Sequence, residues 1–596
     1  MKTYPFSQIE LTDGYLFEKS KLNRNITIPS VYDRFAETGR IKAFNFDYRE
    51  GDEIKPHIFW DSDMAKWIEG AAYELHKKPD ATFSEQIEAL VQKIQEHQGE
   101  DGYFNIYYTV VEPNGRWTNR DRHELYCAGH LMEAAVAYAE ATGKTDLLAC
   151  MEKYADYIYR VFVVEQSASF HTPGHEEIEL ALVRMYRYTK KKKYLDLAAH
   201  FINQRGNVDE YQIDIYNQSH LPVRDQKEAV GHAVRALYLY TGMAYVAKET
   251  GDESLLAACR ALFEDVVDRK MYVTGGVGST NVGEAVTYAY DLPNDTAYTE
   301  TCAAIALIFF AHAMLAFDND AKYADVIERA LYNGVLSGLS LDGTKFFYTN
   351  PLEINVGEQY ENLHGKRKLP RTQRPPVFNC SCCPPNVNRL LASIGNYLYG
   401  RDGDTLYVNQ FVTSTLNADD VQATVKTEYP RNGEITVSAS GVKTIAVRIP
   451  SWCEKFSLNK PYELQNGYAM IENDGSEIAI DLDLTPVAVF ADTRVIRDAG
   501  RLCVMRGPIV YCAESVDNGP NLHSYLVPAD FSYEEQADEY FGLPTLTISC
   551  FKRVNTAEGL YTHKAPRTEQ ATLKLIPYNA FANRGETDMA VWLFAK

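Results

Sequence analysis

Three of the eleven cysteines fall within four positions, in the run Cys380-Ser381-Cys382-Cys383-Pro384-Pro385-Asn386. Clustered thiolates can bind soft metal ions or act as nucleophiles. The two prolines disfavour helical geometry at residues 383 and 384, so we expect the sulfur atoms on a stiff turn just before a helix. The alternative is a chance group of buried thiols.

A second motif, Tyr298-Thr299-Glu300-Thr301-Cys302, adds a carboxylate and another thiol. Residues two apart in a regular helix point about 200° from each other, so Glu300 and Cys302 can share a metal ion only in an irregular first turn. Thr299 is the expected N-cap, which would place them there. Three thiolates and one carboxylate form a tetrahedral set suited to zinc, namely Glu300, Cys302, Cys382 and Cys383.

Acid and base groups stand at comparable places along the chain. Glu284 ends a glycine-rich stretch that would let the backbone approach a ligand closely, although glycines are also ordinary turn residues. His175 and His232 each follow a glycine where a helical segment starts, and His123 and His130 precede or open another one. If these helices run parallel, their N-terminal ends converge on one cavity. Each histidine alone is as readily a structural hydrogen-bonding residue.

The helices that would position these groups recur between residues 60 and 400. Apolar segments rich in small residues alternate with more polar ones, a pattern typical of inner and outer helices. Uneven spacing and long loops favour a closed (α/α) barrel over an open solenoid. After residue 400 short alternating runs predict strands. We therefore expect a barrel domain over 1–400 and β-sandwich domains over 401–500 and 501–596.

Composition limits the possible partners. The net charge of −21 argues against nucleic acid and anionic membranes, which require a basic surface. No apolar run approaches the roughly 20 residues of a membrane-spanning helix, and the N-terminus lacks the pattern of a secretory signal. We expect a cytoplasmic protein with reduced cysteines. The β-rich part is a candidate surface for a homodimer.

Four motifs together resemble the β-L-arabinofuranosidases of glycoside hydrolase family 127 and its near relatives. The likeness runs from about residue 45 to 399 and extends to the β-rich part in layout. The motifs are Met271-Tyr-Val-Thr-Gly-Gly-Val-Gly-Ser-Thr280, Gly283-Glu284-Ala285, Tyr298-Thr-Glu-Thr-Cys302 and Cys380-Ser-Cys-Cys-Pro-Pro-Asn386.

This resemblance implies a fold, a cofactor and residue roles. The fold is an (α/α)6 barrel followed by β-sandwich domains, and the cofactor is zinc bound by the four residues above. Cys382 is the implied nucleophile and Glu284 the general acid/base. The implied sugar contacts are His123 or His130, His175, His232 and Tyr348. Spacing does not distinguish His123 from His130, and Cys383 stays the adjacent alternative nucleophile.

The implied chemistry is that of a retaining exo-glycoside hydrolase that releases L-arabinose from β-L-arabinofuranosides. A thiolate replaces one of the two carboxyl groups such enzymes use, and Glu284 needs a raised pKa to act as an acid. Zinc-activated water is a competing mechanism, but four protein ligands leave it no open position. Three further alternatives are a hydrolase of another unusual plant-cell-wall sugar, an (α/α)-barrel lyase or epimerase, and a carbohydrate-binding protein with a structural zinc.

Overall fold

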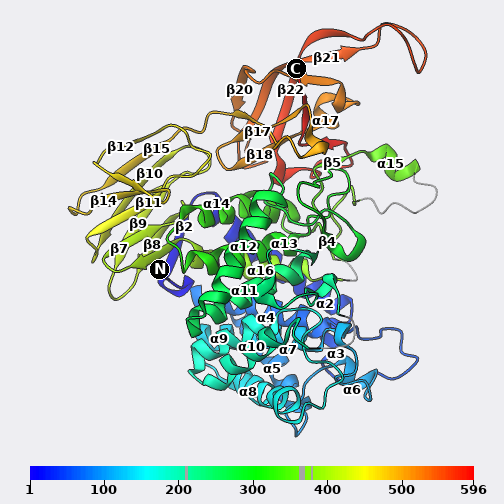
Figure 1. Ribbon diagram of the computed structural model, residues 1–596, viewed down its shortest axis with the longest axis vertical. Coiled ribbons are helices and arrows are strands. Elements are labelled where there is room, and N and C mark those ends of the chain that lie inside the picture. The colour runs from blue at the N-terminus through cyan, green and yellow to red at the C-terminus, as the bar shows by residue number, and fades with distance from the viewer. Residues whose placement is uncertain (209–212, 362–369, 378–379) are drawn as a thin grey trace.

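The computed structural model describes residues 1–208, 213–361, 370–377 and 380–596. Helices occupy most of the chain before residue 399, and strands are the main regular elements after it. Figure 1 shows the helical part from blue to green at one end of the molecule and the β-rich part from yellow to red at the other.

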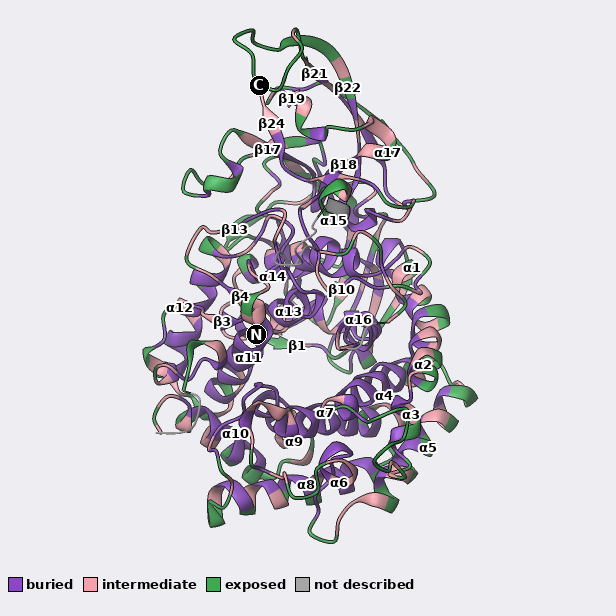
Figure 2. Ribbon diagram, turned by 90° about the vertical axis from the view of Figure 1, so that its right-hand side faces the viewer, coloured by how far each residue is buried: buried purple, intermediate pink, exposed green. Residues whose placement is uncertain are grey.

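Six helices form the inner ring of a barrel. In ring order each packs against the next, and the sixth packs against the first, so the ring is closed (Figure 2). These are α4 (Trp60–Lys77), α7 (Glu124–Thr142), α9 (Ile178–Thr189), α11 (Ala233–Thr250), α13 (Thr301–Leu315) and α16 (Cys383–Ala392). The expected (α/α)6 barrel is confirmed.

The outer helices are amphipathic, and each covers the back of an inner helix. They are α2 (Ile28–Glu37), α5 (Ala81–His97), α8 (Asp146–Tyr159), α10 (Lys192–Gln204), α12 (Glu253–Arg269) and α14 (Ala321–Arg329). The inner helix α13 is apolar almost all round because it is enclosed on every side. In the described part of the chain, no helix is long and apolar enough to cross a membrane.

A group of charged residues crosses the middle of the barrel. We call it the barrel hub, and it consists of the buried Glu69 of α4, Glu133 of α7 and Arg389 of α16 together with the half-buried Arg184 of α9. Arg389 pairs with both carboxylates at 2.9 and 2.6 Å, and Arg184 contacts both from the other side. Arg389 also donates to the hydroxyl of Tyr238 on α11 and lies 5.0 Å from the ring centre of Phe309 on α13. All six inner helices therefore meet at the hub.

Two six-stranded sheets form the first β region, and the first residues of the chain contribute a strand to each. One sheet has the order β1 (Lys2–Thr3), β6 (Tyr399–Asp402), β7 (Thr405–Val408), β11 (Thr444–Arg448), β14 (Tyr468–Glu472) and β13 (Glu463–Gln465). The other has the order β12 (Phe456–Leu458), β15 (Ile478–Leu482), β10 (Glu434–Ser440), β9 (Gln422–Thr427), β8 (Thr413–Asn417) and β2 (Ile9–Asp13). Buried and exposed residues alternate along β9 and β10, as in a sheet with one face on a core.

The second β region is one ten-stranded sheet. Its path runs β16 (Val487–Val489), β17 (Arg501–Arg506), β24 (Leu593–Ala595), β19 (Tyr525–Val527), β21 (Thr545–Val554), β22 (Arg567–Pro577), β18 (Ile509–Glu514), β23 (Met589–Ala590) and β5 (Glu353–Ile354), with β20 (Tyr533–Gln536) beside β21. Strand β17 also pairs with β18, which closes part of the path. Because β5 comes from a loop of the helical part, this sheet is tied to the barrel.

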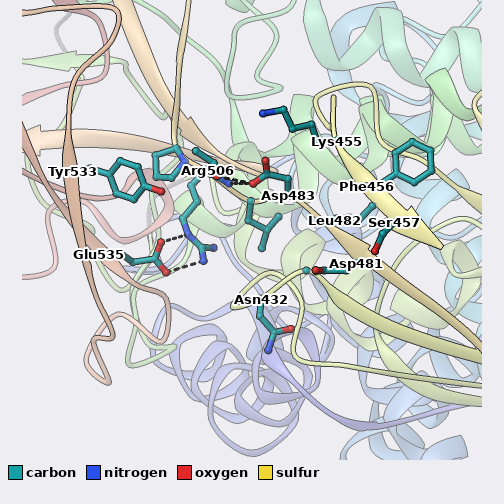
Figure 3. Close-up of a pocket in the computed structure, with 14 residues that line it drawn as sticks. Asn432, Lys455, Phe456, Ser457, Asp481, Leu482, Asp483, Arg506, Tyr533 and Glu535 are labelled. Atoms are coloured by element: carbon teal, nitrogen blue, oxygen red, sulfur yellow. Dashed lines mark hydrogen bonds and ion pairs between the residues drawn. The ribbon is translucent and has the colours of Figure 1, made fainter. Parts of the chain in front are cut away.

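Arg506 links the two β regions at a cleft of about 500 Å³. Its guanidinium donates to both carboxylate oxygens of Glu535 at 2.7 and 2.8 Å, and to the carbonyls of Pro430 and Arg431 in the first region. Figure 3 shows this ion pair beside Tyr533, with Asp483 and Lys455 on the other wall. The cleft is thus a junction between domains, built by residues other than the cysteines of the barrel.

Candidate active site

Four side chains from two inner helices converge at one end of the barrel, which we call the cysteine end. The sulfur of Cys383 lies 3.4 Å from that of Cys302 and 3.7 Å from that of Cys382. The Oε1 atom of Glu300 lies 3.5 Å from Cys382 Sγ and 3.7 Å from Cys383 Sγ. A disulfide would require about 2.05 Å, so these are separate thiols held in contact.

These distances suit a tetrahedral metal ion. Sulfur ligands about 2.3 Å from zinc lie about 3.8 Å from one another, close to the spacing seen here. All four ligand atoms fall within 4.8 Å of one another. Burial, together with the neighbouring Cys382 and Glu284, raises the pKa of Glu300 well above its usual value. So many acidic groups in one enclosed place fit a bound cation.

The cysteine pair sits at the very start of α16. Cys382 is the N-cap residue and Cys383 is the first helical residue. The prediction that the sulfur atoms lie before the helix holds for Cys382 but is wrong for Cys383, because Cys383, Pro384 and Pro385 lie inside the first helical turn. Amide groups there have no partner within the helix, so proline is tolerated.

Glu300 is the N-cap of α13, with extended backbone angles of φ −60° and ψ 138°. The prediction that Thr299 is the cap is wrong by one residue, since its hydroxyl donates to the carbonyl of Asn350 instead. The expected consequence still holds, because Glu300 outside the helix and Cys302 inside its first turn reach the same point. The amide of Thr301 donates to the carbonyl of Tyr348 at 2.9 Å, which pins a second loop to this helix start.

Glu284 lies on a short 3-10 turn, Val282–Glu284, with its side chain half-buried. Its backbone has φ 52°, a left-handed conformation that costs free energy in a residue other than glycine. Burial raises the pKa of its carboxyl, but hydrogen bonds from His232, Tyr348 and Tyr298 outweigh that and lower the pKa to about 2. These hydrogen bonds shift the pKa in the direction opposite to the one that the acid step requires.

His232 is held in one tautomer by its place in the fold. It caps α11, and its Nδ1 atom accepts the amide hydrogen of Val234 at 3.2 Å. The ring proton is therefore on Nε2, which lies 3.3 Å from Glu284 Oε2. Pairing of β3 (Gly231–His232) with β4 (Ala285–Val286) sets this contact, because His232 stands opposite Ala285. Burial lowers the pKa of His232, so the ring is a neutral donor.

The other predicted histidines occupy two depths. His123 and His175 line the cysteine end, with ring centres 5.6 Å apart, and His175 lies 5.5 Å from His232. His130 is not at a helix start: it lies inside α7, is fully buried, and places Nδ1 3.1 Å from Glu177 Oε1. Seven residues of helix put it about 10 Å deeper than His123.

Two tyrosines join this site although we did not predict them. Tyr298 donates a hydrogen bond to Glu284, and it stands two residues before Glu300 in the motif already noted. The ring of Tyr126 lies 4.3 Å from that of His175. Its hydroxyl accepts a hydrogen bond from buried Lys66 at 2.6 Å. The predicted Tyr348 donates to Glu284 Oε2 at 3.0 Å.

Glu300 joins the group that could bind a metal to the group that could move a proton. Ligand atoms of His232, Glu284 and Glu300 lie within 4.8 Å of one another, and Glu300 also belongs to the cysteine set. The residues of this site differ in their exposure to solvent. Cys302, Cys383 and Glu300 are buried, whereas Cys382, Glu284 and Tyr348 are half-buried. The half-buried members are those that a substrate could touch.

Comparison with known families covers nearly the whole chain. Residues 8–396 match the family described as the catalytic domain of β-L-arabinofuranosidase of glycoside hydrolase family 127. Residues 405–484 match the middle domain and 486–594 the C-terminal domain of the same family.

Individual relatives agree. A non-reducing end β-L-arabinofuranosidase of Bifidobacterium longum subsp. longum is 38% identical over 91% of this chain and 90% of its own length. The solved structure of a family 127 β-L-arabinofuranosidase from Geobacillus stearothermophilus T6 has 40% identity and a TM-score of 0.93, covering 99% of this chain and 100% of that one. A solved family 127 β-arabinofuranosidase has 35% identity and a TM-score of 0.90, covering 100% and 98%. The chain belongs to glycoside hydrolase family 127 and is a glycoside hydrolase.

Proposed function

We propose that this enzyme is a retaining exo-hydrolase that releases L-arabinose from β-L-arabinofuranosides. Cys382 is the nucleophile, Glu284 is the acid and base, and zinc is bound by Glu300, Cys302, Cys382 and Cys383. The names of the relatives support the sugar, and the geometry of the cysteine end supports the residue roles.

The exposure of Cys382 carries the proposal. Cys302 is 2% exposed and Cys383 is fully buried, whereas Cys382 is half-buried. A sugar can therefore approach only one of the three sulfur ligands, which favours Cys382 over its neighbour. Burial and the adjacent sulfurs also raise the pKa of Cys383 well above its usual value.

The donor set fits zinc better than magnesium or calcium, because thiolates are soft ligands. When bound, zinc supplies charge that keeps Cys382 deprotonated at neutral pH. Burial raises the pKa of Cys302, but hydrogen bonds from Cys382 and Cys383 outweigh it and lower that pKa to about 6. Metal binding would release the protons that the other thiols still hold.

Two displacements at the anomeric carbon complete the reaction. First, Cys382 Sγ bonds to that carbon while the bond to the leaving oxygen breaks and Glu284 protonates this oxygen. Then Glu284 takes a proton from water, the water oxygen bonds to the carbon, and the carbon–sulfur bond breaks. Two inversions give net retention.

The low pKa of Glu284 sets a requirement on the first displacement. In the free enzyme the carboxylate accepts hydrogen bonds from His232 and Tyr348, so it is ionised. A bound sugar displaces water from the half-buried carboxylate, and loss of solvation raises a carboxyl pKa. Glu284 therefore gains its proton in the complex and serves as a base after the leaving group departs.

Position separates the candidate sugar contacts. His123, His175, His232 and Tyr348 line the cysteine end, while His130 lies below it against Glu177. We assign the sugar contact to His123 and a structural role to His130.

The direct test is hydrolysis of para-nitrophenyl β-L-arabinofuranoside, with the β-L-arabinopyranoside as matched control. Activity should be lost with a chelator and restored by zinc. Proton NMR of the first product should show the anomer of the substrate. Mass spectrometry of the acid-quenched enzyme should place a pentosyl group on Cys382.

Several results would contradict the proposal. Full activity after removal of all metal would show that zinc is not needed to keep Cys382 as a thiolate. An inverted first product would exclude the covalent route. Hydrolysis of only the pyranoside would contradict the proposed sugar but would leave the proposed roles of Cys382 and Glu284 unchanged.

A further inference from the structure

A second cavity, of about 590 Å³, opens at the opposite end of the barrel, which we call the far end. Residues from the C-terminal halves of the inner helices line it, together with the segment Thr3 to Ser7 near the chain start. Its volume lies in the range of about 300–1,000 Å³ usual for small-molecule sites.

The barrel hub separates this cavity from the cysteine end. Its four residues form the inner wall of the cavity. On the other side, Arg389 donates to Asn386 Oδ1 at 2.6 Å and to the Tyr238 hydroxyl at 3.0 Å. Asn386 stands three residues after Cys383, and the ring of Tyr238 lies 6.2 Å from that of His175. The hub residues therefore lie between the far-end cavity and the residues of the cysteine end.

Most charges at the far end are already paired, whereas the exposed Glu140 of the lining forms no ion pair within the described residues. Arg184 and Arg389 are matched by Glu69 and Glu133, and Arg187 contacts Glu249 at 2.8 Å. An ionic ligand held by the hub would have to break one of its pairs, which is costly because Glu69, Glu133 and Arg389 are buried. A neutral ligand would leave them intact.

The remaining lining combines aromatic faces with an unused hydrogen-bonding atom. Phe309 and Tyr245 lie on inner helices yet are half-buried, because they face the cavity. His312 packs edge-on to Tyr397 at 4.9 Å, and its Nε2 atom is enclosed with no hydrogen-bond partner among the described residues. Burial lowers the pKa of His312 to about 4, so the ring is neutral.

We infer that the far end is a second carbohydrate site, which binds a neutral sugar such as a pentose or a short oligosaccharide. Sugar rings present apolar faces to aromatic side chains, and their hydroxyl groups can donate to or accept from His312 and the paired carboxylates. The site is independent of the reaction at Cys382.

Equilibrium dialysis of the whole wild-type enzyme with radiolabelled L-arabinose tests this directly. We expect a second binding event beyond the one at the cysteine end. His312→Ala and Tyr245→Ala should each weaken the second event at least about tenfold. Activity on the aryl arabinofuranoside at low substrate should stay within about twofold of wild type. His200→Ala, on the outer helix α10, is the matched control and should change neither.

Two outcomes would overturn the inference. A single binding event in the wild-type enzyme would do so without any variant. A second event that survives both substitutions, in proteins with unchanged melting temperature, would place the sugar elsewhere. Crystals soaked in L-arabinose give the position independently. If the proposed reaction at Cys382 is wrong, the second binding event is unaffected. The far end is lined by residues other than Cys382 and Glu284.

Discussion

The inner helices begin at the cysteine end and finish at the far end, and the charged groups follow that direction. Glu300 caps α13 and Cys383 opens α16, whereas Arg389 and Lys248 stand in the last turns of α16 and α11. A helix carries partial positive charge at its N-terminus and partial negative charge at its C-terminus, worth about 0.3–1 kcal/mol each. A ring of parallel helices therefore favours thiolates and carboxylates at one mouth and guanidinium groups at the other.

The two ends also differ in strain and in pairing. At the cysteine end, His123, Glu284 and Thr299 have left-handed backbones with φ of 63°, 52° and 28°. At the far end, the hub residues satisfy one another through ion pairs. Strained backbone is thus found beside the reactive groups, whereas the hub residues are held by ion pairs.

Cys382→Ala should have the largest effect on activity. Loss of the nucleophile is expected to lower kcat by about 10⁴-fold or more, as when a catalytic nucleophile is removed elsewhere. Steady-state rates on the aryl arabinofuranoside measure this. Cys150→Ala, a buried thiol on the outer helix α8, should keep wild-type rates. A kcat of Cys382→Ala within tenfold of the wild-type value would contradict the assignment of the reaction to the cysteine end.

Glu284→Gln is expected to lower kcat by about 10²–10⁴-fold, because proton transfer is lost in both displacements. Zinc content should be unchanged, since Glu300 and not Glu284 belongs to the sulfur set. The far-end counterpart is Glu249→Gln, which removes the partner of Arg187 and should leave the rate unaffected. Loss of zinc in Glu284→Gln would show that the two groups are not separable.

Arg389→Met tests how much the barrel hub stabilises the protein. Removing this guanidinium leaves two buried carboxylates with only Arg184, so we expect a loss of about 3–5 kcal/mol in the free energy of unfolding. Urea denaturation followed by tryptophan fluorescence measures it. Arg260→Met breaks a solvent-exposed pair with Asp318 and should cost less than about 1 kcal/mol. Equal losses in the two variants would argue against a special role for the hub.

Tyr348→Phe should have the smallest effect, a shift in pH dependence. The hydroxyl donates to the ionised form of Glu284 and so lowers its pKa; removing it raises that pKa. The protonated acid then persists to higher pH, and because Glu284 takes up its proton in the complex, the alkaline limb of the kcat profile should move upward by up to about one pH unit. A shift toward lower pH would contradict the assigned direction of this hydrogen bond.

Local pattern was a good guide where chemistry depends on neighbours in the chain. The alternation of apolar and polar helices predicted the barrel, and the thiols around Cys302 and Cys382 predicted a shared cluster. Pattern failed at single-residue boundaries. Thr299 looks like a cap, but its hydroxyl is taken by the carbonyl of Asn350, a residue about fifty positions away.

The sequence by itself determined the kind of chemistry, because side-chain types and helical period are local properties. It supplied soft ligands at helix starts and a carboxylate on a glycine-rich turn. Only the tertiary structure decided which sulfur is exposed, that His130 lies inside α7 against Glu177 while His123 stands at the start of that helix, and in which direction the pKa of Glu284 shifts. Exposure and pKa depend on residues brought together from distant parts of the chain, such as His232 and Tyr348 around one carboxylate, and no spacing along the sequence encodes that enclosure.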